Sequence, residues 1–387
     1  ELESRGSTTL TDALRITPGV TVGQWGTDVR GTEWMMIRGF DAIDSSYRDG
    51  LLQAGFYNIT SSTEMYGLER VEVLRGPASM MFGQGDAGGV VNRVSKMPHA
   101  GAVNEVEVQY GTYDRKQIAA DLNGQLNDNG TLRYRLVGVG LDSESADKYI
   151  TGDSLEQQRI YFAPSLRWQP SADTSLTVLS ELYKNTTGDD IGYLVGVNGE
   201  ETNIKEGEPS YSEIRQKSAS IGYLFEHRFN EQWQVKQNLR YSQRSSDKDH
   251  FNSSLDTTTA VLEREVMFHH DELKQLAVDS QLHGSVATGT VQHTVLAGLD
   301  FNRSEGDLLG RNGSAPSLDF YNPIYGQAIT PPKSTIHNLS ETMQQLGVYA
   351  QDQIKFTPNW LLTVGGRYDW VSKDVDNRRK KTQSEQD

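Results

Sequence analysis

The residues Gly83-Gln84-Gly85-Asp86-Ala87-Gly88 have the G-x-G-x-x-G spacing of a dinucleotide-binding loop. In such a loop the glycines let the backbone approach a pyrophosphate, and the helix that follows directs its N-terminus at the phosphates. Here the next residues, Gly89-Val90-Val91-Asn92-Arg93-Val94, are typical of a strand. Because the helix is missing from the pattern, we interpret the glycines as a tight backbone turn.

Two adjacent histidines, His269 and His270, could suggest a metal site. Neighbours on a strand point to opposite faces, so these imidazoles cannot chelate one ion from a regular strand. The sequence has no cysteine, which excludes disulfides and thiolate metal sites. The motifs of α/β-hydrolases, zinc proteases and P-loop NTPases are also absent from the sequence. We therefore predict no enzymatic activity, no cofactor and no metal held by the protein itself.

A run of alternating charges, Leu68-Glu69-Arg70-Val71-Glu72-Val73-Leu74-Arg75, predicts a short strand inside a globular domain. Two interpretations remain open. The charges form a solvated face, or they pair with opposite charges on a wall that surrounds the domain. The candidates for contact with such a wall are Glu69, Arg70, Glu72 and Arg75.

The composition limits the class of protein. With 37 Lys and Arg against 52 Asp and Glu, the net charge of −15 lacks the basic face that a nucleic-acid partner requires. Only 36% of residues are hydrophobic, and no run approaches the roughly 18 apolar residues of a membrane helix. The 37 glycines, and a tyrosine count of 17 against 11 phenylalanines, favour a turn-rich β protein with aromatics at polar boundaries.

The side chains of residues 360–371 divide into two alternating faces of different character. One face is apolar with a tryptophan at each end, Trp360 and Trp370, and the opposite face carries Arg367 and Asp369. A lipid-facing strand of about ten residues with aromatic girdles has this pattern. The same alternation recurs at residues 132–138, 160–168, 233–241 and 276–286.

Short turns alternate with long polar loops along this part of the chain. The sequence predicts short turns at residues 111–114, 127–130, 170–173, 229–232, 287–290 and 357–359. It predicts long loops near residues 143–157, 186–214, 245–258 and 305–340. Transmembrane barrels have short periplasmic turns and long external loops, so the spacing favours a barrel wall of about 11 strands. A soluble β-sandwich for ligand binding or adhesion remains the alternative.

The chain divides into two predicted domains. Residues 1–102 mix short helix and strand signals, including a capped helix at residues 8–14, and predict a compact α+β domain. Residues 103–387 carry the alternating strands. The charged tail at residues 378–387 has the character of an interrupted loop, and an odd strand number leaves an unpaired edge, so we expect a fragment without its signal peptide.

Several long motifs follow one another in both domains. The first domain contains Ile37-Arg38-Gly39-Phe40, Tyr47-Arg48-Asp49-Gly50-Leu51, the stretch from Tyr66 to Ser79, Phe82-Gly83-Gln84-Gly85 and Gly88-Gly89-Val90-Val91-Asn92. The second contains Asp300-Phe301, Tyr321-Asn322-Pro323, the stretch from Gly347 to Gln353 and Gly365-Gly366-Arg367-Tyr368-Asp369-Trp370. From Glu1 to about Ser372 the chain resembles the TonB-dependent siderophore receptors of bacterial outer membranes, in particular the ferric hydroxamate (ferrichrome-type) branch.

The resemblance implies a mainly β fold, a transmembrane antiparallel barrel that encloses an N-terminal plug. Residues 1–102 would be the plug, and residues 103–387 would supply about 11 of 22 barrel strands. The resemblance further implies import of a ferric siderophore, in which the siderophore itself holds the iron. Receptors of other ligands, such as catecholate siderophores or cobalamin, remain the alternative within the family.

The resemblance also implies candidate ligand contacts. An Arg suits a hydroxamate chelate because a charged donor binds its oxygen acceptors well, and aromatic rings supply rigid contact area. The candidates are Arg38, Gln53, Phe56 and Tyr57 on apical plug loops, Trp25 on a further plug loop, and Tyr193 and Phe251 in external loops. Leu308 and Leu309 occupy a loop region where the family places an aromatic contact, which argues against ferrichrome itself.

The partners implied by the resemblance are TonB with its inner-membrane energy complex, the ferric siderophore, and outer-membrane lipid with lipopolysaccharide. The protein is expected to be a monomer in the bacterial outer membrane. The segment that contacts TonB would precede Glu1.

Overall fold

The alternating half of the chain folds into one antiparallel sheet in which each strand pairs with its sequence neighbours. The computed structural model describes residues 8–23, 33–42, 46–59, 63–75, 82–83, 88–101, 104–189 and 192–386. The strands of the large sheet are β8 (Glu105–Tyr110), β9 (Lys116–Gln125), β10 (Leu132–Lys148), β11 (Ser154–Trp168), β12 (Thr174–Gly188), β13 (Glu213–Arg228), β14 (Trp233–Asp256), β15 (Val261–Thr288), β16 (Val291–Asp319), β17 (Ser334–Thr357), β18 (Trp360–Asn377) and β19 (Thr382–Gln386).

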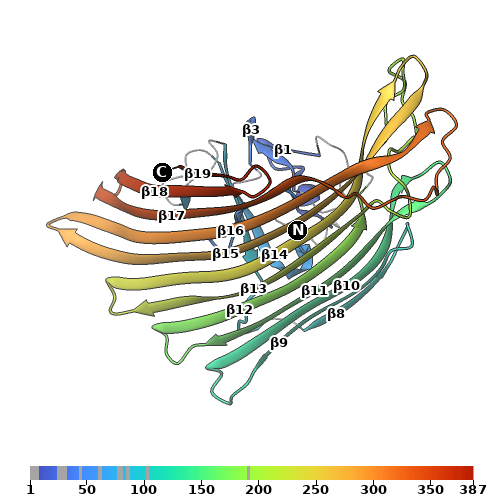
Figure 1. The fold of residues 1–387 in the computed structure, drawn as a ribbon. Helices are drawn as coiled ribbons and strands as arrows, with labels where there is room; N and C mark the ends of the chain where they lie inside the picture. The colour runs from blue at the N-terminus through green and yellow to red at the C-terminus, as the bar shows by residue number, and fades with distance from the viewer. Residues whose placement is uncertain are drawn as a thin grey trace.

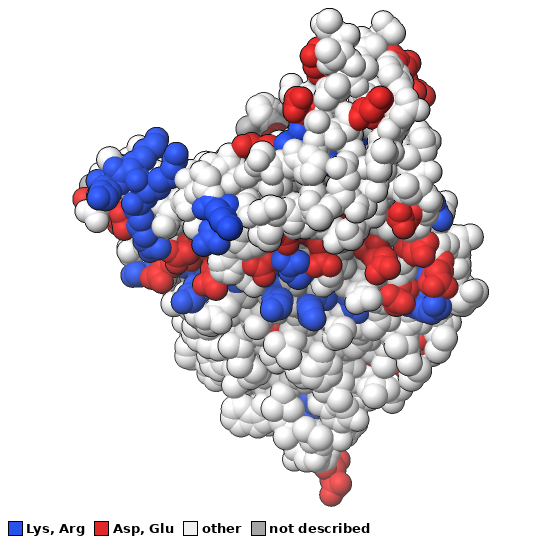
Figure 2. Space-filling model, turned by 45° about the vertical axis from the view of Figure 1, so that its right-hand side comes forward, with Lys and Arg blue, Asp and Glu red and all other residues white. Residues whose placement is uncertain are grey.

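The two faces of this sheet differ as the alternation predicts. On β18, Trp360, Leu362 and Trp370 are exposed on the outer face. On the inner face, the Arg367 guanidinium donates to the Asp300 carboxylate at 2.5 and 2.9 Å. Figure 2 shows the charged side chains gathered in a band, with a surface almost free of charge below it. An apolar outer face of this kind is what contact with lipid requires.

The strands are longer than predicted. Residues 245–258 and 305–340 are predicted to be loops, but β14, β16 and β17 extend through most of them. Strand β15 alone has 28 residues, whereas about ten suffice to cross a bilayer. The extensions form hairpins that project from one end of the sheet (Figure 1). Lipid no longer imposes an apolar outer face on these extensions, and apolar side chains such as Leu262, Leu318 and Phe320 are instead buried in a cluster of their own.

The predicted count of about 11 strands omitted β19. Its five residues pair with β18, with Thr382 opposite Asn377. The sequence predicts an interrupted loop at residues 378–387, because these residues show no alternation of apolar and polar side chains. Backbone pairing with the preceding strand does not require one.

The N-terminal region forms two small sheets that lie within the curve of the large one (Figure 1). The first contains β1 (Val20–Val22), β2 (Met35–Ile37) and β3 (Phe40–Asp41); the second contains β5 (Leu51–Leu52), β4 (Ser46–Arg48), β7 (Gly89–Ser95) and β6 (Leu68–Arg75). The short helix α1 (Leu10–Leu14) and the 3₁₀ helix η2 (Met65–Gly67) accompany them. The mainly β fold with an α+β region inside a barrel wall is therefore confirmed.

Local sequence explains two of these elements. Helix α1 begins after Thr9, whose hydroxyl accepts a hydrogen bond from the Asp12 backbone N–H at 3.1 Å. The glycine-rich segment is followed by strand β7, which begins at Gly89 with a φ of 140°. A strand at this place removes the helix that a dinucleotide loop would need. Among the described residues, no helix is both long enough and apolar enough to cross a membrane.

Candidate functional site

Among the described residues, five ion pairs connect the N-terminal region, here called the plug, to the inner face of the large sheet, here called the wall. They are Lys96–Asp121 on β9 (2.9 Å), Glu69–Arg135 on β10 (3.3 Å), Glu64–Arg159 on β11 (2.9 Å), Arg48–Glu181 on β12 (2.8 Å) and Asp49–Arg240 on β14 (2.5 Å). The wall residues come from strands that are neighbours or near neighbours in the sheet. The plug is therefore held by charges distributed along the wall rather than at one point.

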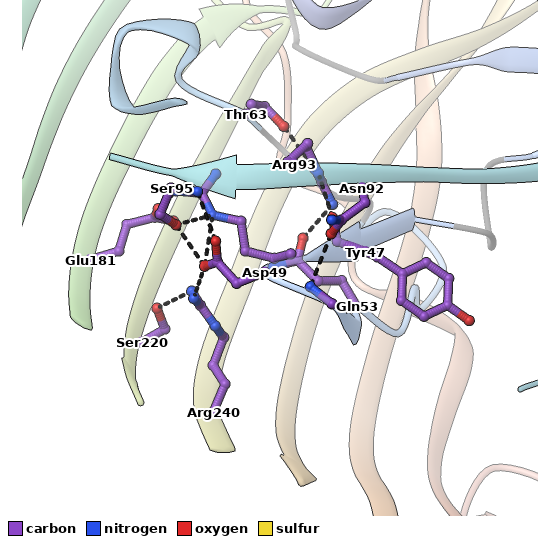
Figure 3. A network of polar contacts seen from close by, with 12 residues as sticks. Tyr47, Asp49, Gln53, Thr63, Asn92, Arg93, Ser95, Glu181, Ser220 and Arg240 are labelled. Carbon is purple, nitrogen blue, oxygen red and sulfur yellow. Dashed lines mark hydrogen bonds and ion pairs between the residues drawn. The ribbon is translucent and has the colours of Figure 1, made fainter. Parts of the chain in front are cut away.

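A tight turn positions two of the plug charges. Asp49 and Gly50 connect β4 to β5 with φ angles of 51° and 84°, the left-handed conformation that a two-residue Asp-Gly hairpin turn adopts. The Asp49 carboxylate accepts hydrogen bonds from the backbone N–H and the hydroxyl of Ser95 at 2.7 and 2.6 Å. Its second oxygen also meets Arg240 (Figure 3). The turn therefore presents a fixed carboxylate to the wall.

The preceding residue, Arg48, points its guanidinium at a wall carboxylate of opposite sign. Its side chain is 7% exposed and donates to Glu181 at 2.8 Å and to the Ser95 hydroxyl at 2.9 Å. Burial by itself lowers the pKa of Arg48, but the carboxylates of Glu181 and Asp49 outweigh it, and the net shift is upward. Arg48 therefore carries its charge at every physiological pH.

Arg93 of β7 organises the interior of the plug. Its guanidinium, 1% exposed, donates to Glu33, to Thr63 and to Gln53 at 3.1, 2.7 and 2.5 Å (Figure 3). Burial lowers the pKa of Arg93 despite the Glu33 carboxylate. These bonds connect segments that are far apart in the sequence, which makes Arg93 the centre of the plug's polar core.

The four charges of the predicted run have different partners. Glu69 reaches Arg135 on the wall. Arg70 pairs with Glu72 on the same strand at 2.7 Å, and both are partly exposed. Arg75 donates to the Pro18 carbonyl at 2.9 Å, within the plug. Among the described contacts of this run, only that of Glu69 crosses to the wall.

Arg38 lies at the tip of the turn between β2 and β3. It and Gly39 have φ angles of 55° and 84°, again the conformation of a tight hairpin turn, and the Arg38 N–H donates to the Gly19 carbonyl at 2.8 Å. The residue is exposed. Among the described residues, no hydrogen-bond partner is present for its guanidinium. The turn thus fixes the backbone and leaves the charge available.

The loop after β5 contains three further predicted contacts. Gln53 turns inward and accepts the hydrogen bond from Arg93. Phe56, 8% exposed, packs against Leu273 and Leu308 of the wall. Tyr57 is 57% exposed and meets the Phe56 ring edge-to-face at 4.9 Å. Of the three, Tyr57 is the one whose ring faces outward.

The external candidates take part in packing. Phe251, expected in a loop, lies on β14, is 3% exposed, and has the Arg264 guanidinium 5.2 Å above its ring. Tyr193 is exposed, but the Lys205 ammonium lies 4.5 Å above its ring and its hydroxyl accepts the Lys148 N–H at 3.2 Å. Trp25 lies outside the described residues.

Two further expectations concern the wall. Leu308, expected in a loop, lies on β16 and is buried against the plug. His269 and His270 have separate partners, the His250 imidazole at 3.1 Å and the Asp247 carboxylate at 2.6 Å. Among the described residues, no group of three or more His, Asp or Glu side chains is arranged to hold a metal ion.

Of the plug residues in the five ion pairs, the sequence predicts only Glu69 as a wall contact. Arg48, Asp49, Glu64 and Lys96 were not singled out as wall contacts, although the Asp-Gly turn was a usable signal for Asp49. The wall partners were also detectable in part, since a charge at an inward position of an alternating strand requires a partner.

The sequence matches two family models, the "TonB-dependent Receptor Plug Domain" over residues 1–90 and "TonB dependent receptor-like, beta-barrel" over residues 161–387. It is 32% identical to the "Ferrichrome outer membrane transporter/phage receptor" of Escherichia coli (strain K12), over 97% of this chain and 54% of that protein. It is also 32% identical to the "Ferrioxamine B receptor" of Salmonella typhimurium (strain SL1344), over 96% and 54%.

Among solved structures, the fold is similar to the ferric-catecholate import receptor Fiu of E. coli K12 in its open form. The TM-score is 0.85 at 21% identity, covering 97% of this chain and 59% of that one. The chain spans about half the length of the curated relatives it matches. With a plug held inside an antiparallel barrel wall and both family models matched, the chain belongs to the TonB-dependent receptor family.

Proposed function

We propose that the whole protein is an outer-membrane receptor that imports a ferric siderophore of the hydroxamate class, driven by TonB. Two curated relatives are named as receptors for ferrichrome and ferrioxamine B. The relatives are transporters and receptors. In this proposal the transported ligand carries its own iron, and the protein contributes recognition and a movable plug.

The observation that carries the proposal is the exposed guanidinium of Arg38 on a rigid turn. A hydroxamate chelate presents oxygen acceptors around the iron, and a charged donor held in place binds them at little entropic cost. Tyr57 adds an exposed aromatic surface on a second plug loop. Phe56 and Gln53 act behind these two, because Phe56 is buried against the wall and the half-buried Gln53 binds Arg93 in the plug interior.

The plug also has the physical properties of a part that can move. Its apolar core is built from its own residues, Leu10, Leu14, Met35, Ile37, Ala42 and Val91. Its contacts with the wall include the five ion pairs, and paired charges fix register more than they add stability. Water can replace each partner when the plug is pulled. We place the boundary between plug and barrel near residue 102, between the end of β7 and the start of β8.

We further propose that the receptor acts as a monomer surrounded by outer-membrane lipid and lipopolysaccharide. The exposed apolar outer face of the wall supports the lipid contact. TonB and its inner-membrane complex would act on the plug from the opposite side of the membrane.

Uptake of radioactive iron by cells that express the full-length receptor tests this function. Iron supplied as a ferric hydroxamate should enter cells with TonB and should bind without entering in cells that lack TonB. Iron supplied as a ferric catecholate is the matched control. Equal uptake with and without TonB would contradict energy coupling, and uptake of the catecholate alone would contradict the ligand class.

A further inference from the structure

A small cavity lies between the plug and the wall, separate from the exposed candidate contacts. Its lining includes Gln53 and Asn58 from the plug, Tyr183 from β12, and Arg244 and Ser246 from β14. Its volume is about 30 Å³, enough for one or two particles of the size of a water molecule. A siderophore, or even one of its chelating arms, is too large for it.

Hydrogen-bond donors without partners line this cavity. The Nε and Nη1 of Arg244 and the hydroxyl of Ser246 are buried and have no hydrogen-bond partner among the described residues. The buried Tyr183 hydroxyl also lines the cavity and interacts with the Arg159 guanidinium. The remaining Arg244 nitrogen, Nη2, donates to the Ala54 carbonyl and to Gln275. Buried polar groups are nearly always satisfied, so the cavity must hold something that accepts hydrogen bonds.

The charges around the cavity show which kind of acceptor fits. Among the described residues, five guanidiniums lie largely buried in this part of the interior, and four of them have a carboxylate partner: Arg48 with Glu181, Arg93 with Glu33, Arg159 with Glu64, and Arg240 with Asp49. No carboxylate pairs with Arg244 among the described residues. Glu181 also lines the cavity, but its carboxylate is engaged by Arg48 and by the Tyr161 hydroxyl. Among the described residues, Arg244 is therefore the guanidinium of this group that lacks a carboxylate partner.

We propose that this cavity binds a small monovalent anion of the size of chloride, held by Arg244, Tyr183 and Ser246. Water would satisfy the donors but would leave a buried charge uncompensated, which is costly. An anion satisfies both requirements at once. Because Arg244 also binds the Ala54 carbonyl of the plug loop, the anion fixes the arginine that connects wall and plug.

The anion stabilises the closed arrangement of plug and wall. A ligand that binds only the folded, closed state raises its stability as the ligand concentration exceeds the dissociation constant. Bromide, which has the same charge and a similar size, is a suitable probe because its anomalous scattering identifies its position.

The test uses the full-length receptor in detergent, with chloride exchanged against gluconate at constant ionic strength. Gluconate is too large for the cavity, so the melting temperature should rise with chloride and reach a plateau. R244Q should abolish the rise. Y183F, which removes one hydroxyl and keeps the ring, should weaken binding of the anion about three- to tenfold. This variant keeps the test valid if R244Q does not fold. R303Q is the matched control, because Arg303 forms an exposed pair with Glu305 on β16, and it should respond as the wild type does.

Crystals soaked in bromide should show an anomalous peak beside Arg244. A melting temperature that is the same in chloride and gluconate would overturn the proposal, as would an anomalous map without a peak in the cavity. Neither result depends on which siderophore the receptor transports, so this test and that of the proposed function can fail separately.

Discussion

Arg48 of the plug and Glu181 of β12 lie 133 positions apart in the sequence, and their side chains form a 2.8 Å ion pair that is almost fully buried. The next plug residue, Asp49, pairs with Arg240 of β14. Two adjacent plug residues of opposite sign thus meet two wall residues of opposite sign. A shift of the plug by one position would bring like charges together, so the pairs set its register.

The first prediction concerns this ion pair. Glu181→Gln removes the nearer carboxylate of the buried Arg48 guanidinium and leaves only that of Asp49, at 3.8 Å, so the free energy of unfolding should fall by at most about 3 to 5 kcal/mol. Chemical denaturation of the full-length receptor in detergent measures this. Glu305→Gln, in an exposed pair with Arg303, should cost less than about 1 kcal/mol. If both changes cost the same small amount, the plug register is not set by these charges.

The second prediction concerns the candidate ligand donor. Arg38→Ala should weaken binding of a ferric hydroxamate by roughly 10- to 100-fold, since one charge-assisted hydrogen bond is lost. The melting temperature should not change, because the side chain is exposed. Arg15→Ala is the control, as Arg15 is an exposed plug arginine paired with Asp12. An unchanged dissociation constant for Arg38→Ala would exclude it as a donor.

The third prediction separates ligand contacts from packing. Phe251→Ala should destabilise the receptor by about 3 to 5 kcal/mol, because it removes a fully buried ring. Tyr57→Ala should weaken siderophore binding with little effect on stability, because its ring is exposed. Thermal unfolding and ligand titration of both variants provide the comparison. The opposite pattern would show that Phe251 contacts the ligand.

The fourth prediction concerns the orientation of the wall. Leu362→Arg places a charge on the exposed apolar face of β18 and should destabilise the folded barrel in a bilayer by about 2 to 4 kcal/mol near the midplane. Thr363→Arg, its neighbour on the opposite face of the strand, is the matched control and should cost much less. Equal folding of both variants in lipid vesicles would mean that the lipid-facing side has been assigned wrongly.

The sequence alone was sufficient for the barrel wall where lipid imposes an alternation. Around Trp360 and Trp370, the side of the strand that faces lipid must be apolar, and the other side is polar. The sequence therefore predicts both the strand and the side that faces lipid. Beyond the bilayer this requirement ends. The sequence therefore predicts loops at residues 245–258 and 305–340, although they are mainly strand. Backbone hydrogen bonds between strands do not require any pattern of side-chain polarity.

The plug contacts could be predicted less well. Glu69 and Arg70 are adjacent in the same run of alternating charges. Glu69 nevertheless reaches Arg135 on the wall, while Arg70 pairs with Glu72. Which charge crosses to the wall depends on the position of the whole plug, and that is decided by residues far away in the sequence. The same holds for Phe251, which is buried against Tyr211 and the Arg264 guanidinium, two residues outside its own strand.

A tryptophan-fluorescence titration of the purified full-length receptor tests most directly whether its ligand is a ferric hydroxamate. The ligands are a ferric hydroxamate, the same hydroxamate without iron, a ferric catecholate and cobalamin. Saturable quenching with the ferric hydroxamate is expected at the lowest dissociation constant, with at least about tenfold weaker binding of the others, equivalent to about 1.4 kcal/mol. Saturable binding of the catecholate or of cobalamin, with no response to any hydroxamate, would contradict this ligand class.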